Sequence, residues 1–109
     1  MAINAFNPQG NTVTFLAAAS APTAVQAPAA GAATTAVRIL NSGNVTVFLG
    51  VGSSNAAAVN AAVNVATNAA SIPLLPGTDE VLIFPPLSFF TGITLSGNAQ
   101  VYISPGEGL

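Results

Sequence analysis

Very few side chains in this sequence could take part in acid–base or nucleophilic chemistry. The chain has no histidine, cysteine or lysine, and its charged residues are Arg38 and three acids, Asp79, Glu80 and Glu107. Without histidine, cysteine or lysine, no Ser-His-Asp, Cys-His or Schiff-base arrangement can form. Asp79 and Glu80 are neighbours on an expected strand, so they point to opposite faces and cannot flank one bond as a glycosidase pair does. We therefore expect no enzymatic activity and no catalytic residue.

The same inventory argues against a metal or a cofactor. The spacing of the three carboxylates matches no calcium-binding loop. The segment Gly50-Val51-Gly52 follows a strand-like run and is similar to the start of a dinucleotide-binding loop. However, Asn55 stands where a third glycine is needed, and no acid follows at the usual interval of about 20 residues. We interpret Gly50–Gly52 as a turn that leaves a strand, and we expect no cofactor.

Arg38 is the only cationic side chain, and it lies in an apolar run between Val37 and Ile39. A buried guanidinium without a partner is costly. We expect a structural ion pair between Arg38 and Glu80, which would join two strands in a buried or half-buried position. The alternative is that Arg38 reaches an acid on a partner subunit.

The composition is unusual for a free monomer. Only 4% of the 109 residues are charged and 51% are hydrophobic, with a formal net charge of −2. A typical domain has about 25% charged residues, and a mixed charged surface normally keeps monomers apart. We therefore expect this surface to be covered, either by copies of the same chain or by a larger assembly.

One arginine cannot supply the several phosphate contacts that nucleic acid or anionic lipid binding requires. The two most apolar stretches are interrupted by proline or by asparagines, so neither is a good membrane span. We expect no nucleic-acid partner and no membrane association.

The pattern of elements indicates an all-β fold. Short apolar runs alternate with Gly, Pro, Asn and Ser turns, which is typical of a sandwich or barrel. We predict a jelly-roll-like β domain over 34–109, preceded by an extended arm at 1–33 with one or two strands of its own, as a single domain overall. The expected strands are 12–16, 37–40, 45–51, 80–84, 89–95 and 99–104.

Three local features complete this prediction. Asn41–Asn44 separates two of the strands, 37–40 and 45–51, as the loop of a β-hairpin. A short helix near 55–62 interrupts an alanine-rich excursion. Leu75-Pro76-Gly77-Thr78 fits a type II turn, with proline second and glycine third.

The aromatic residues are candidate contacts with a partner. Phe89 and Phe90 are adjacent, so one should face the core and the other should face outward. An outward phenylalanine is either a lone exposed residue or part of an association patch. The candidate partner contacts are Phe6, Phe15, Phe89, Phe90 and Tyr102.

Four motifs from residue 34 onward resemble small virion proteins of tailed bacteriophages that decorate or cement the capsid. The motifs are Arg38–Gly43 (RILNSG), Val47–Gly52 (VFLGVG), Pro73–Val81 (PLLPGTDEV) and Val101–Leu109 (VYISPGEGL). The resemblance implies a small jelly-roll-like domain, present in many copies on the outer capsid surface as dimers or trimers. It implies the major capsid protein as partner and brings no catalytic residues. The alternative is a tail, fibre or cell-surface binding module.

Overall fold

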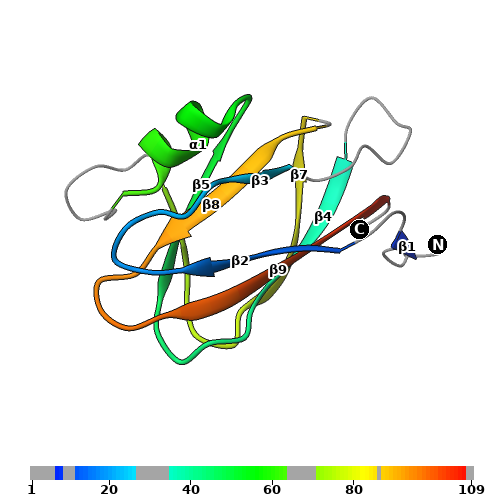
Figure 1. Ribbon diagram of the computed structural model, residues 1–109. Coiled ribbons are helices and arrows are strands. Elements are labelled where there is room, and N and C mark those ends of the chain that lie inside the picture. The colour runs from blue at the N-terminus through cyan, green and yellow to red at the C-terminus, as the bar shows by residue number, and fades with distance from the viewer. Residues whose placement is uncertain (1–6, 9–11, 27–34, 64–70, 86, 108–109) are drawn as a thin grey trace.

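The chain folds into two antiparallel β-sheets and one short helix (Figure 1). The computed structural model describes residues 7–8, 12–26, 35–63, 71–85 and 87–107. This architecture confirms the all-β prediction and the sandwich. The jelly-roll winding stays a prediction.

Sheet A contains β1 (Asn7–Pro8), β2 (Val13–Ala17), β4 (Thr35–Asn41), β7 (Asp79–Phe84) and β9 (Ala99–Glu107). β9 pairs with β4 on one side and with both β2 and β1 on the other, and β7 follows β4. Sheet B contains β3 (Val25–Gln26), β5 (Val47–Gly52), β6 (Ile72–Leu74) and β8 (Phe89–Ile93), in the order β3-β8-β5-β6.

The core lies between the two sheets, because alternate residues of the strands point inward. Sheet A contributes Phe15, Ala17, Val37, Ile39, Ala99, Val101 and Ile103, and sheet B contributes Val47, Leu49, Leu74 and Phe90. Phe84 of β7 meets Phe90 edge-to-face, with ring centroids 5.3 Å apart. The sheets are therefore held together by aliphatic and aromatic packing.

The expected arm lies within the sandwich wherever the structure describes it. β2 pairs with β9 along its whole length, and β3 pairs with β8 in the opposite sheet. In the segment that joins β2 to β3, the Ala18 carbonyl accepts a hydrogen bond from the Thr94 amide at 2.9 Å. Residues 12–26 therefore cross from one sheet to the other and contribute Phe15 and Ala17 to the core.

The helix α1 (Asn55–Ala61) covers sheet B, as predicted for the alanine-rich excursion. It begins at Ser54, whose hydroxyl accepts a hydrogen bond from the Ala57 amide at 3.2 Å. Gly50 and Gly52 of β5 explain its close approach. A Cβ atom at Gly50 would lie 2.2 Å from the Ala58 carbonyl oxygen, and one at Gly52 would lie 2.6 Å from the Ala57 Cβ. The two glycines let the helix backbone rest on the strand.

The predicted hairpin at Asn41–Asn44 is wrong, because β4 and β5 belong to different sheets. The turn residues lead the chain across the sandwich, since both flanking runs must bury an apolar face and opposite sheets achieve this. The Asn41 side chain is fully buried at this corner. Its amide donates to the carbonyls of Val45 (3.0 Å), Leu74 (3.0 Å) and Leu75 (3.3 Å), and its Oδ1 accepts from the Gly43 amide (3.0 Å).

Two other features bear on the predicted boundaries. The Leu75–Thr78 turn is confirmed, with Gly77 at φ 77° and the Thr78 amide 3.0 Å from the Leu75 carbonyl. β9 continues through Pro105, where we expected it to end. Pro105 lies between the last β2 pair, at Ile103, and the β1 pair at Gly106. Proline is tolerated in a strand where no ladder bond is required of its nitrogen.

Candidate interaction surface

The outward side of sheet A has no helix across it among the described elements, because α1 packs on β5 and β8 of sheet B. We call this side the outer face. Its residues are Thr12, Thr14, Leu16, Arg38, Leu40, Asp79, Val81, Ile83, Gln100, Tyr102 and Ser104. Cross-strand register sets them in rows, such as Thr14–Tyr102–Leu40–Asp79. The face carries one positive and one negative side chain, Arg38 and Asp79.

Arg38 and Asp79 form a bidentate ion pair on the outer face. Arg38 Nε lies 2.8 Å from Asp79 Oδ1, and Nη2 lies 2.5 Å from Oδ2. The two side chains are 52% and 41% exposed, so the pair is at the surface. Asp79 raises the pKa of Arg38, chiefly through the hydrogen bond, and Arg38 in turn lowers the pKa of Asp79.

The expected partner of Arg38 was Glu80, and the structure pairs Arg38 with Asp79 instead. The reason is the alternation of strand side chains. Val37 and Ile39 are buried, so Arg38 points outward, whereas Glu80 is on the side of β7 that carries Leu82 and Phe84 toward the core. Arg38 and Glu80 thus lie on opposite faces of the same sheet.

The other polar side chains of the outer face bond to one another or to the backbone. Thr12 Oγ1 and Ser104 Oγ are 2.8 Å apart. Gln100 Nε2 donates to Thr14 Oγ1 at 2.5 Å, and Thr14 Oγ1 donates to the Val101 carbonyl at 2.8 Å. Each of these four side chains therefore has at least one partner within the chain, and an apolar surface that covered them would leave those bonds in place.

Three large apolar side chains stand out from the outer face. Leu16 is 48% exposed, Ile83 is 52% exposed and Tyr102 is 40% exposed. They come from β2, β7 and β9, so they are spread over the width of the sheet. A partner that lies flat on this face would bury all three.

Of the four described aromatic residues that were predicted as partner contacts, only Tyr102 is exposed. Phe15 and Phe90 are buried core residues, and Phe89 is half-buried at the start of β8. Phe6 lies outside the described residues. Leu16 and Ile83 were not predicted as contacts from the sequence. The alternation of strand side chains could have identified them, because Leu16 follows the buried Phe15 and Ile83 lies between Leu82 and Phe84.

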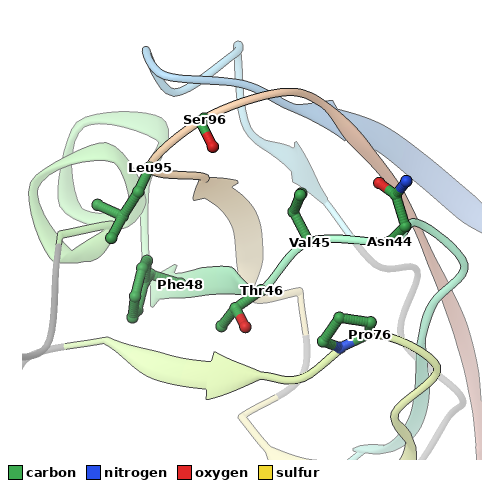
Figure 2. Close-up of a pocket in the computed structure, with 7 residues that line it drawn as sticks. All are labelled: Asn44, Val45, Thr46, Phe48, Pro76, Leu95 and Ser96. Carbon is green, nitrogen blue, oxygen red and sulfur yellow. The ribbon is translucent and has the colours of Figure 1, made fainter.

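Two hollows lie at the ends of the sandwich, away from the outer face. The first has a volume of about 390 Å³ and is lined by Asn44, Val45, Thr46, Phe48, Pro76, Leu95 and Ser96. Figure 2 shows Leu95 and Phe48 at one end of it and Asn44 and Pro76 at the other. The second, of about 420 Å³, is lined by Gln26, Val51, Gly52, Ser53, Pro85, Leu87 and Ser88. Neither lining includes a group that could act as a general acid or base.

Comparisons with known proteins identify no relative. No family model, curated protein or solved structure matches this chain. Within the described ranges, no helix is long and apolar enough to cross a membrane. The same ranges hold no cluster of three or more acidic, histidine or cysteine side chains that could bind a metal ion.

Proposed function

We propose that this protein is a structural component of a tailed-bacteriophage virion. It decorates the outer surface of the capsid and cements the shell by bridging neighbouring subunits of the major capsid protein. The observation that carries this proposal is the outer face, where Thr12, Thr14, Gln100 and Ser104 bond within the chain and large apolar side chains are exposed. The resemblance of the sequence motifs to decoration proteins supports the same function.

Attachment works by covering the outer face. Removal of apolar surface from water contributes roughly 25 cal/mol per Å². The polar groups keep their internal bonds when they are covered, which reduces the cost of removing them from water. A copy that bridges two subunits gains avidity, because its second contact forms while the first already holds it, and it links the two subunits.

The test is binding of the purified protein to shells assembled without it, measured by co-sedimentation. Leu16→Asp places a charge within the outer face and should weaken binding at least tenfold, because a carboxylate would be buried against the shell. Leu75→Asp is the matched control. Leu75 is 63% exposed at the β6–β7 turn, away from the outer face, and its variant should bind like the parent protein.

Salt provides a second measure in the same experiment. Binding should persist from 0.1 to 1 M NaCl, because apolar contact is not screened and the chain has few charges. Release of the protein in moderate salt, or equal binding by the two variants, would contradict attachment through this face. Circular dichroism of both variants verifies that they fold.

A second candidate is a tail, fibre or cell-surface binding module, and Tyr102 is the observation that favours it. An exposed ring beside hydrogen-bonded Thr14 and Gln100 combines an apolar surface with polar groups, as ligand sites do. Binding of the free protein to a surface polysaccharide, lost in Tyr102→Ala, together with no binding to shells, would support this candidate over cementing.

A further inference from the structure

Among the described strands, β7 forms the edge of sheet A on the β4 side. Among the described strands β7 pairs only with β4, and none of its six residues is buried. β2 borders the opposite side of the sheet, but it curls toward sheet B and contacts β3 and β8. The edges of sheet B are short, since β3 has two residues and β6 has three with Pro73 in the middle. β7 is therefore the edge best suited to accept another strand.

The hydrogen-bond pattern identifies which backbone groups point away from β4. The Asn41 amide donates to the Thr78 carbonyl, and this bond continues the β4–β7 register by one pair. In an antiparallel ladder, bonded pairs alternate with non-bonded pairs. Glu80, Leu82 and Phe84 therefore bond to β4. The amides and carbonyls of Asp79, Val81 and Ile83 point outward from the edge.

We propose that β7 pairs antiparallel with β7 of a second copy of this chain, about a two-fold axis through Val81. In this register Val81 faces Val81, and Asp79 faces Ile83 of the second copy. By symmetry, Ile83 also faces Asp79 of the second copy, so the strand makes three pairs in total. These pairs use every outward backbone group of the strand, and each pair can exchange two backbone hydrogen bonds. The two copies of sheet A become one continuous sheet, with both outer faces on the same side.

The Asp79 charges of the edge are compatible with this pairing, whereas the two Glu80 carboxylates lie on the opposite face only two positions apart, roughly 7 Å along the strands, and repel one another. The Asp79 carboxylate, which would lie across from Ile83 of the second copy, is already bonded to Arg38. The two Asp79 residues are four positions apart along the strands, roughly 14 Å at about 3.4 Å per residue. This separation exceeds the screening length of about 8 Å at physiological salt. The strand carries no lysine, the residue that commonly protects an edge from such pairing.

The inference deepens the proposed function by naming the self-association edge beside the outer face. Its test is performed on free protein without shells, so either proposal can fail alone. A dimer that does not bind shells would contradict the cement function only. Shell binding by a strictly monomeric protein would contradict the edge pairing only.

The first experiment is cysteine crosslinking, which is clean because the natural chain has no cysteine. Val81→Cys places the two thiols across from one another, and a short bis-maleimide should convert most of the protein to a covalent dimer. Ile83→Cys is the matched control on the same strand. Its two thiols would be about 14 Å apart, so it should crosslink at least tenfold less. Equal crosslinking of the two variants would overturn the register.

The second experiment measures the backbone bonds. Val81→Pro removes the central donor in each copy, while the bonds of β7 to β4 remain. The dimer dissociation constant, from sedimentation velocity, should rise at least tenfold relative to Val81→Thr, which keeps the amide. In the parent protein, the Val81 and Ile83 amides should exchange with deuterium more slowly as protein concentration rises. Exchange rates independent of concentration, or a monomer at 0.1 mM, would overturn the pairing.

Discussion

At the scale of single residues, Asn41 shows how a polar side chain can direct the fold. Its side chain is fully buried, and its amide and oxygen bond to four backbone groups of the corner. Its backbone also bonds to Thr78 and Gly77 of the next turn. One residue thus joins the β4–β5 crossing to the β6–β7 turn.

Asn41→Asp should destabilise the protein by at least about 2 kcal/mol, because a carboxylate would face carbonyl oxygens and would lose the donors that bond them. Urea unfolding at pH 7 measures this loss. The loss should shrink at acid pH, where a protonated carboxyl regains one donor. Asn44→Asp makes the same change at an exposed position three residues away and should have little effect. Equal losses in the two variants would contradict the role assigned to Asn41.

At the scale of elements, the contact of α1 with β5 depends on the absence of side chains at two positions. The sequence predicts a turn that leaves a strand at Gly50-Val51-Gly52, but both glycines lie within β5. Their small size serves helix–strand packing. The sequence pattern of a strand, two glycines and a helix therefore has a structural explanation here.

Gly50→Ala should cost on the order of 2 kcal/mol or more, because the new methyl group would overlap backbone atoms of Ala58 and Ala62. Helix backbone cannot rotate away as a side chain can, so α1 would have to shift. Thermal unfolding followed by circular dichroism measures the loss. Ser53→Ala, in the loop between β5 and α1, is the control and should unfold close to the parent protein. An unchanged Gly50→Ala variant would mean that α1 moves without cost.

At the scale of the whole molecule, the scarcity of charge predicts a simple dependence on pH. The chain has no histidine, so no side chain with an ordinary pKa near neutrality is present. The hydrogen bond from Arg38 holds the pKa of Asp79 below its ordinary value of 3.8. A lowered pKa contributes stability that is fully present above the unfolded value and is lost as pH falls through the folded value.

The urea midpoint should therefore stay level between pH 5 and 7 and fall below about pH 4. In Asp79→Asn the urea midpoint should fall less steeply below about pH 4, because the carboxylate that is protonated in this range has been removed. A midpoint that changes between pH 5 and 7, or an acid limb of the same slope in both proteins, would contradict this account.

Much of the fold could be predicted from the sequence, because periodicity and turn residues act locally. Alternation in β2 and β7, the Leu75–Thr78 turn and the helix near 55–62 all follow from neighbouring residues. The partner of Arg38 could also have been predicted, because Arg38 must point outward if Val37 and Ile39 are buried. The pairing of the strands could not be predicted, because the turn residues at Asn41–Asn44 fit a hairpin and a crossing between sheets equally well. The choice between them depends on contacts with Leu74 and Gln100, which are far away in the sequence.

The position of β9 has a consequence for how the protein is made in the cell. β9 is the last of the described strands along the chain, yet it lies between β4 and the pair of β1 and β2. While a ribosome is still translating residues before 99, β4 and β2 have no common neighbour, and the core lacks Ala99, Val101 and Ile103. The nascent chain therefore completes sheet A only after β9 has left the ribosome, and until then its exposed apolar surface favours aggregation or chaperone binding.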